Sequence, residues 1–203
     1  MAPSNAGPVV RLVQPAIPQA EKWDRLNRQT HLDQLVTLSR RNGLHPKLVI
    51  WPETAFAGFA SRNAALLDKT VRDATSKKGT LITGIPRFGN DRTLLNSAIM
   101  LNHEGKTKGI YNKRHLVPFG EYMPLRKWLP FLQPIVGAVD FSAGQNNALM
   151  QLEGIGKMQL LICYEVIFSG EVLSLSMRPD LIVNITNDAW FGVSAGPWQH
   201  LFQ

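Results

Sequence analysis

The only cysteine of the chain, Cys163, stands at the end of an apolar run, and Glu165 follows two positions later. At such a turn from strand to helix, the side chain leaves the sheet and backbone N–H groups point toward whatever it attacks, which stabilises an oxyanion and helps a thiolate to form. A lone cysteine in a strand is more often a buried, inert core residue. The nearby carboxylate favours the reactive alternative, because a core cysteine rarely adjoins an ionisable group. Cys163 is therefore predicted to be the nucleophile of an acyl-transfer reaction.

Two other ionisable residues also follow apolar, strand-like runs. Glu53 comes after residues 48–51 and Pro52, where a partly desolvated carboxylate suits a general base. Lys113 follows residues 108–111, where an ammonium can neutralise an oxyanion and promote the thiolate. Taken singly, Glu53 is explained equally well as a helix-capping or surface acid, and Lys113 as a solubilising residue.

The elements that must position these residues alternate between strand and helix patterns. Strands are predicted over 9–13, 48–51, 80–85, 96–101, 108–111, 149–152, 157–162 and 181–185, and helices over 32–39, 64–76 and 169–176. The alternation indicates an α/β domain with one mixed sheet, or two sheets, between helices. Because α/β sheets place their sites at the carboxyl ends of strands, the three residues form a stronger constellation together than singly. Glu121 is a second candidate carboxylate, which can orient Lys113 or a substrate amine.

The bulk composition limits the class of protein. The 203 residues, 44% hydrophobic and 18% charged, are enough for one globular domain and too few for two. The 22 basic and 15 acidic residues give a net charge of +7, but the densest basic groups are pairs without interleaved aromatic residues, so no nucleic-acid surface is expected. No apolar run of about 18 residues is present, and residues 1–8 are expected to form a flexible leader.

Residues 118–144 differ from the rest of the chain. They contain four prolines, several glycines and large apolar side chains that include Trp128, Leu129 and Phe131. A long irregular segment in a compact domain is usually a lid or a binding loop. A mobile loop is therefore expected at about 118–144.

Three short motifs resemble a known family. Trp51-Pro52-Glu53, Asn112-Lys113 and Cys163-Tyr164-Glu165 are similar, in this order, to the Glu–Lys–Cys triad of the nitrilase superfamily. Within the superfamily, the chain resembles the apolipoprotein N-acyltransferases, which N-acylate bacterial lipoproteins. This closer resemblance is carried by residues 14–23, 115–122 and 184–192, and it runs from about Val9 to Gln203.

The resemblance implies a fold and a place in the cell. The expected fold is an α/β, nitrilase-like α-β-β-α sandwich over residues 9–203, with its C-terminal part missing. In the family this domain faces the periplasm from the bacterial inner membrane, held by transmembrane helices that this chain lacks. The truncated chain is accordingly expected to be unstable or inactive.

The resemblance also implies an activity without a metal or organic cofactor. A phospholipid donates an acyl chain to the cysteine as a thioester, and the chain passes to the N-terminal amine of a diacylglyceryl-cysteine prolipoprotein at the membrane surface. Glu53 would be the base, Lys113 the oxyanion stabiliser and Cys163 the nucleophile. By the same resemblance, supporting residues are Glu121, Glu165, Tyr164 and Trp23, and the lipid-facing loop residues are Trp128, Leu129 and Phe131.

Two other functions compete with the acyltransferase. The first is a soluble amidase of the nitrilase superfamily, which would use the same triad on a small amide. The second is a non-catalytic basic binding module, which predicts that binding falls steeply with salt and that Cys163 is dispensable. Against the amidase stand the apolar loop at 118–144 and the motif at 115–122, which soluble relatives do not share in this form.

Overall fold

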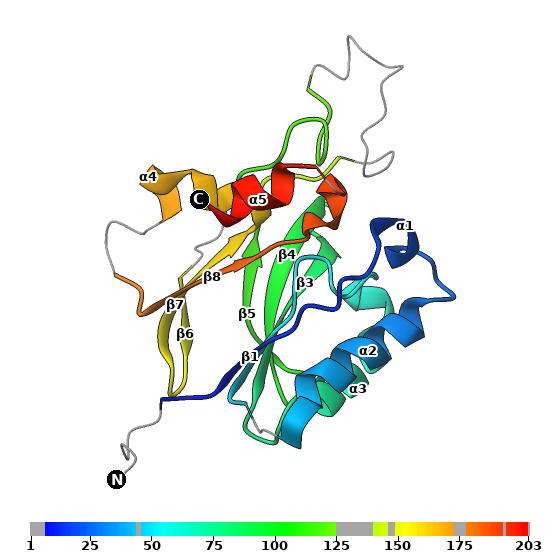
Figure 1. The fold of residues 1–203 in the computed structure, drawn as a ribbon, viewed down its shortest axis with the longest axis vertical. Helices are drawn as coiled ribbons and strands as arrows, with labels where there is room; N and C mark the ends of the chain where they lie inside the picture. The colour runs from blue at the N-terminus through cyan, green and yellow to red at the C-terminus, as the bar shows by residue number, and fades with distance from the viewer. Residues whose placement is uncertain are drawn as a thin grey trace.

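Two β-sheets pack face to face in the computed structural model, which describes residues 7–43, 46–124, 140–145, 149–172, 178–192 and 194–202 (Figure 1). The first sheet has the strand order β1 (Val10–Leu12), β2 (Leu48–Ile50), β3 (Thr80–Phe88), β4 (Leu94–Asn102) and β5 (Thr107–Asn112). The second sheet has the order β6 (Leu149–Leu152), β7 (Gly156–Ile162) and β8 (Leu181–Ile185). The prediction of two sheets, rather than one, is the correct alternative.

Both sheets mix parallel and antiparallel pairs. Strands β1, β2 and β3 are parallel, whereas β3, β4 and β5 form two successive antiparallel hairpins. In the second sheet, β6 and β7 form a hairpin and β8 is parallel to β7. The carboxyl ends of β2, β5 and β7 precede Glu53, Lys113 and Cys163, so the sheet topology determines where these side chains emerge.

The strand β2 shows how the core is divided. Leu48 and Ile50 belong to the apolar core between the two sheets, together with inward-facing residues of β6, β7 and β8. Val49 and Trp51 belong to a second core, between the first sheet and the helices. A parallel strand covered on both faces carries a continuous apolar run rather than an alternating one, which is the pattern of residues 48–51.

The helices α2 (Arg28–Arg40) and α3 (Ala64–Ala74) cover the outer face of the first sheet (Figure 1). The indole nitrogen of Trp51 donates a hydrogen bond of 2.9 Å to Ser39 Oγ, which itself donates to the Leu35 carbonyl of α2 at 2.7 Å. These bonds join helix α2 to the chain two residues before Glu53. The predicted helix at 32–39 begins four residues earlier, at Arg28, where polar residues precede the apolar spacing.

The remaining helical segments of the described chain are short. They are α1 (Gln19–Lys22), η1 (Arg41–Gly43), η2 (Ala60–Arg62), η3 (Cys163–Ile167), α4 (Ser169–Val172), η4 (Asp188–Phe191) and α5 (Gly196–Leu201). In Figure 1, α4 and α5 lie beyond the ends of β7 and β8. The helix predicted over 169–176 is confirmed to Val172, and residues 173–177 lie outside the described part. Within the described ranges, no helix has both the length and the apolar character needed to cross a membrane.

Candidate active site

Glu53, Lys113 and Cys163 line one cavity of about 300 Å³. Each follows the end of a different strand, β2, β5 or β7, and each is at most 7% exposed. The structure therefore brings together the three side chains that the sequence singled out, although their chemical roles stay predictions. Glu121 also lines the cavity and is 7% exposed.

The main chain at Glu53 is held against strand β3. A β-carbon at Gly84 would lie 2.3 Å from the Thr54 nitrogen and 2.6 Å from the Glu53 α-carbon, so only glycine fits there. The Gly84 N–H donates to the Pro52 carbonyl at 3.2 Å. On the other side, Lys22 Nζ donates to the Glu53 carbonyl at 3.1 Å. The position of the Glu53 carboxylate is thus set by backbone contacts as well as by its own side-chain partners.

A hydrogen-bond network joins the two carboxylates. Asn96, on β4, donates through Nδ2 to Glu53 Oε1 and to Glu121 Oε1, both at 2.7 Å. The other Glu53 oxygen accepts a hydrogen bond of 3.2 Å from the Asn187 backbone N–H, which comes from the chain after β8. Lys113 Nζ lies 2.8 Å from Glu121 Oε2 and 3.8 Å from Glu53 Oε1. Glu121 is therefore the direct counter-ion of Lys113, and Asn96 holds Glu53 beside that pair.

The charges of this network act on Lys113. Burial alone would lower the pKa of its ammonium group, but the nearby charges of Glu53 and Glu121 outweigh burial, and the net effect raises the pKa above its ordinary value. Lys113 is consequently a permanent cation over the physiological range. A permanent cation can stabilise developing negative charge but is a poor proton donor.

The Cys163 backbone has a φ of 56°, in the left-handed region that only glycine adopts without strain. The residue stands at the junction of β7 and η3, so the predicted strand-to-helix turn exists, but a five-residue 3₁₀ helix follows it.

Burial, followed by the charge of Glu53, raises the pKa of the Cys163 thiol to about 12, while Lys113 and a side-chain hydrogen bond from Thr186 oppose the increase. The thiol is a weak acid toward bulk water and needs a local base.

Glu165 lies outside the cavity and joins the strand ends that carry the site. Its Oε1 accepts hydrogen bonds from the Tyr111 hydroxyl and the Arg114 N–H, both at 2.7 Å, and from the His115 N–H at 3.2 Å. Its Oε2 accepts a bond of 2.9 Å from the Ile162 N–H. Glu165 therefore links the segment after Lys113 to the residue before Cys163, and it is 2% exposed.

The other predicted supporting residues occupy different places. Trp23 lines the cavity and is 43% exposed, so it belongs to the mouth. Tyr164 is not among the cavity-lining residues; its ring lies 5.6 Å from the ring of His200. Trp128, Leu129 and Phe131 lie outside the described residues.

Apolar side chains form much of the cavity wall. They are Val117, Pro118, Phe119, Phe141 and Phe191, together with Trp23. A tight turn at 117–122 orders part of this wall, because the Glu121 N–H donates to the Val117 carbonyl at 2.8 Å and the Phe119 N–H donates to the Tyr122 carbonyl at 2.8 Å. The turn places Glu121 in the interior and leaves Phe119 53% exposed. The cavity is thus polar and charged at the triad and apolar elsewhere.

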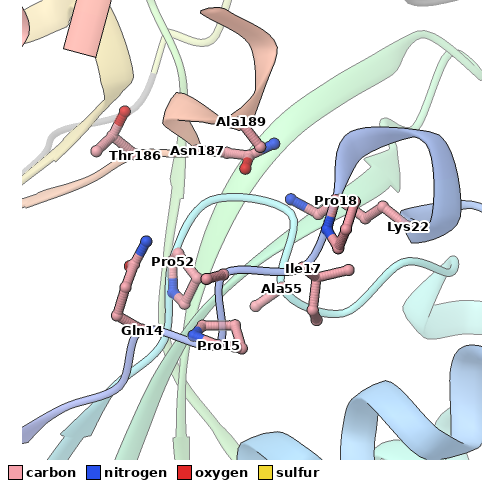
Figure 2. Close-up of a pocket in the computed structure, with 11 residues that line it drawn as sticks. Gln14, Pro15, Ile17, Pro18, Lys22, Pro52, Ala55, Thr186, Asn187 and Ala189 are labelled. Carbon is pink, nitrogen blue, oxygen red and sulfur yellow. The ribbon is translucent and has the colours of Figure 1, made fainter. Parts of the chain in front are cut away.

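A second pocket of about 210 Å³ lies next to the Pro52–Ala55 turn (Figure 2). Residues 14–18, Lys22 of α1, and Thr186, Asn187 and Ala189 complete its lining. Lys22 is only 5% exposed, and burial lowers its pKa to about 8 despite the opposing charge of Glu53. This pocket places a buried amine next to the main chain of the predicted base.

Sequence reasoning did not identify Asn96, Lys22 or Gly84 as part of the site. The polar pair Asn96-Ser97 interrupts an otherwise apolar strand, and this interruption is a signal that could have revealed Asn96. Lys22 and Gly84 carry no such local signal, because only the folded chain brings them to Glu53.

Known proteins are similar to this chain in sequence. An apolipoprotein N-acyltransferase from Rhizobium rhizogenes is 38% identical over 216 residues, covering 100% of this chain and 40% of the relative. One from Rickettsia prowazekii is 38% identical over 196 residues, covering 94% of this chain and 39% of the relative. The chain therefore spans about 40% of the length of these relatives.

Solved structures extend the comparison to the fold. A carbon-nitrogen hydrolase from Helicobacter pylori aligns with a TM-score of 0.59 at 14% identity, over 87% of this chain and 59% of that one. An amidase double mutant from Nesterenkonia sp., in complex with acrylamide, aligns with a TM-score of 0.59 at 17% identity, over 95% and 72%. These likenesses support the predicted nitrilase-like α/β fold. Because the carbon-nitrogen hydrolase family pattern matches residues 9–203, the chain belongs to the carbon-nitrogen hydrolase family.

Proposed function

We propose that this chain carries the catalytic site of an apolipoprotein N-acyltransferase. The site moves an acyl chain from a phospholipid, through a thioester on Cys163, to the N-terminal amine of a diacylglyceryl-cysteine prolipoprotein. The observation that carries the proposal is the convergence of Glu53, Lys113 and Cys163 in a buried cavity with an apolar wall. The relatives named apolipoprotein N-acyltransferase support the same choice of reaction.

In the first half-reaction, Glu53 takes the proton of the Cys163 thiol and the sulfur attacks the ester carbonyl of the phospholipid. Proton transfer inside the site keeps its total charge constant, so a thiol pKa of about 12 toward bulk water does not prevent thiolate formation. The ester C–O bond breaks, the thioester C–S bond forms, and the lysophospholipid leaves with the proton from Glu53. The Lys113 ammonium faces the oxyanion of the tetrahedral intermediate.

In the second half-reaction, the amine of the prolipoprotein attacks the thioester. Glu53 accepts the proton of the amine, the C–S bond breaks as the amide C–N bond forms, and the thiolate regains the proton. Splitting the transfer in this way replaces one difficult step by two easier ones. Asn96 and Glu121 hold Glu53 and Lys113 in their relative positions throughout.

The apolar mouth suits an acyl chain. Trp23 and Phe119 are both cavity-lining and strongly exposed, which is unfavourable in water and favourable at a lipid interface. We further propose that the domain meets the bacterial inner membrane from its periplasmic side, with the loop at about 118–144, including Trp128, Leu129 and Phe131, facing the lipid.

The test is the mass of the intact protein after incubation with vesicles of phosphatidylethanolamine and phosphatidylglycerol. We expect the mass to increase by that of one acyl chain. Hydroxylamine should remove this adduct, and Cys163→Ala should not form it. Glu53→Gln should also lose the adduct, because the amide cannot accept the thiol proton. Gln29→Ala, a change of an exposed amide side chain on α2 that donates to Asp33 of the same helix, is the matched control and should keep the adduct.

The alternative is an amidase that acts on small amides. If the folded protein forms no adduct with phospholipid but hydrolyses a small amide such as acrylamide, the acyltransferase proposal is wrong and the amidase replaces it. An adduct on Cys163 followed by transfer to an acceptor amine excludes both the amidase and a non-catalytic binding module.

A further inference from the structure

Helix α1 contacts the segment of Glu53 from outside the catalytic cavity. Its first and last residues, Gln19 and Lys22, are three positions apart, so their side chains lie on one face of the helix. Lys22 lines the second pocket beside Pro52 (Figure 2) and is not among the residues that line the catalytic cavity. The reaction described above uses neither Gln19 nor Lys22.

The Lys22 ammonium group bonds to the main chain of the predicted base. Its Nζ donates to the Glu53 carbonyl oxygen at 3.1 Å, and Lys22 is only 5% exposed. A charged donor makes a stronger hydrogen bond than a neutral one, and the exclusion of water strengthens it further. The bond therefore restrains the peptide group that follows the Glu53 α-carbon.

The turn after Glu53 has a backbone conformation that needs such a restraint. Thr54 has a φ of 50°, in the left-handed region that is unfavourable for a β-branched residue. Strained residues of this kind persist only where the surrounding structure holds them. From the side of β3, the Gly84 N–H donates to the Pro52 carbonyl at 3.2 Å, and from the side of α1, Lys22 donates to the Glu53 carbonyl. The two bonds hold the turn before and after the Glu53 α-carbon.

A second connection leads from α1 to the Glu53 carboxylate. Gln19 Oε1 accepts a hydrogen bond of 2.9 Å from Asn187 Nδ2. The backbone N–H of the same asparagine donates to Glu53 Oε2 at 3.2 Å. Helix α1 is thus fixed relative to both the main chain and the carboxylate of Glu53.

The burial of Lys22 is unfavourable for its charged form. Burial lowers its pKa to about 8, although the charge of Glu53 opposes the decrease. The amine is still mostly protonated at pH 7. A methionine would fill much of the same space without the free energy of burying a charge. Space filling therefore does not account for a lysine at this position, whereas the hydrogen bond to the Glu53 carbonyl does.

We infer that Lys22 is a positioning residue for Glu53. Its ammonium group holds the turn of residues 52–55, so that the Glu53 carboxylate stays in the cavity that it shares with Cys163. Because Lys22 is not among the residues that line this cavity, it acts on the thiol through Glu53. The inference rests on the proposed function, in which Glu53 is the base, but its effect on the thiol is measurable without a phospholipid.

Alkylation of Cys163 by iodoacetamide at pH 7 tests this role. Cys163 is the only cysteine, so the intact mass reports on this thiol alone. Lys22→Met keeps a side chain of similar length without the N–H donor. It should slow alkylation by about tenfold or more, since misplacing a reacting group by about 1 Å can cost about a hundredfold in rate.

Two further variants show whether the donor or the space is required. Lys22→Arg keeps a charged donor, for which the adjacent pocket of about 210 Å³ leaves room, and it should recover most of the rate. Lys78→Met, a change of an exposed lysine before β3, is the matched control and should react at the parent rate. If Lys22→Met does not fold, Lys22→Leu takes its place in each comparison.

A second background separates positioning from a general loosening of the fold. In a Glu53→Gln protein, Lys22→Met should change the alkylation rate no further, because an amide that cannot accept the thiol proton gains nothing from being held in place. A general loosening would change the rate in both backgrounds. Thermal melts at pH 7 show that each variant is folded.

Three results would overturn the inference: the parent rate in folded Lys22→Met, equal losses in the two backgrounds, or a folded Lys22→Arg protein as slow as Lys22→Met. If the phospholipid adduct forms on the parent protein and one of these results is found, the proposed function stands without the inference. If alkylation behaves as expected but no phospholipid adduct forms, Lys22 still positions Glu53 and the acyltransferase proposal fails.

Discussion

The α-carbon of Glu53 lies 2.6 Å from the position that a β-carbon at Gly84 would occupy. No side chain can be added at position 84 unless the turn that carries Glu53 moves away from β3. The contact joins two segments through their main chains, so no rotamer change can relieve it.

Gly84→Ala is expected to displace Glu53 and to abolish the acyl adduct on Cys163. Overpacking of this kind should also lower the free energy of unfolding by about 1–3 kcal/mol. Urea denaturation followed by tryptophan fluorescence measures the second effect. Gly170→Ala is the control, because a β-carbon at position 170 meets nothing within 4 Å. Equal stability and activity of the two variants would contradict the close approach.

Lys113→Met removes the cation that lies between two buried carboxylates. The variant should lose about 3 kcal/mol or more of stability, because breaking a buried ion pair leaves charge uncompensated. Adding Glu121→Gln removes one of the charges and should restore part of the loss. The double-variant cycle in urea measures the coupling, and additive effects of the two changes would contradict the direct pairing of Lys113 with Glu121.

Glu165→Gln tests the connection between the strand ends. The carboxylate accepts four hydrogen bonds, and an amide must turn its NH₂ group toward at least one of the donors. We expect a loss of about 2–3 kcal/mol in urea denaturation. Tyr111→Phe removes a single donor and should lose less. A Glu165→Gln protein as stable as the parent would show that the carboxylate does not hold these segments.

Lys22 makes the stability of the protein depend on pH. Its folded-state pKa of about 8 lies below the ordinary lysine value of 10.5, so between these values the unfolded chain binds a proton that the folded chain does not. The free energy of unfolding should therefore rise with pH across this window, by at most ~3 kcal/mol. Thermal melts of the parent and of Lys22→Met from pH 7 to 10 measure it, and only the parent should show the rise.

Titration of Cys163 changes the free energy of unfolding in the opposite direction from that of Lys22. A control for that experiment must therefore remove the thiol. Its folded-state pKa of about 12 lies above the ordinary cysteine value of 9.0, so stability is lost as pH rises from 9 toward 12. Melts in a Cys163→Ala background remove this contribution and isolate Lys22. A flat difference between the parent and Lys22→Met in that background would mean that Lys22 titrates normally.

The sequence indicated the strand ends well because local patterns mark them. The apolar run 48–51 is followed by Pro52 and Glu53, and the run before Cys163 is followed within three positions by Glu165. The strands β6 and β8 have the predicted bounds. Strand β3 extends three residues beyond the prediction, through Pro86 to Phe88. Proline is normally excluded from a central strand, but β2 pairs with β3 only as far as Ile82, so the Pro86 nitrogen has no neighbour to bond on that side.

The polar network was less accessible to sequence reasoning. Asn96 bonds Glu53 and Glu121 from 43 and 25 residues away, and Asn187 bonds Glu53 from 134 residues away. No periodicity or turn signal encodes such partners. Tyr164, whose supporting role stays a prediction, packs on His200 and does not line the cavity, because the 3₁₀ turn after Cys163 directs successive side chains to different sides.

The hydrogen bond from Asn187 to Glu53 also bears on how the protein matures. Its partners are separated by 134 residues and belong to segments that follow strands of different sheets. Contacts of such long sequence separation form late, after the local hairpins of each sheet. During synthesis, Glu53 and Lys113 leave the ribosome before Cys163. They meet the thiol only after the second sheet has docked on the first. A nascent chain thus carries a cysteine whose partner base and cation are not yet beside it, and a change in its rate of alkylation would report the docking of the two sheets.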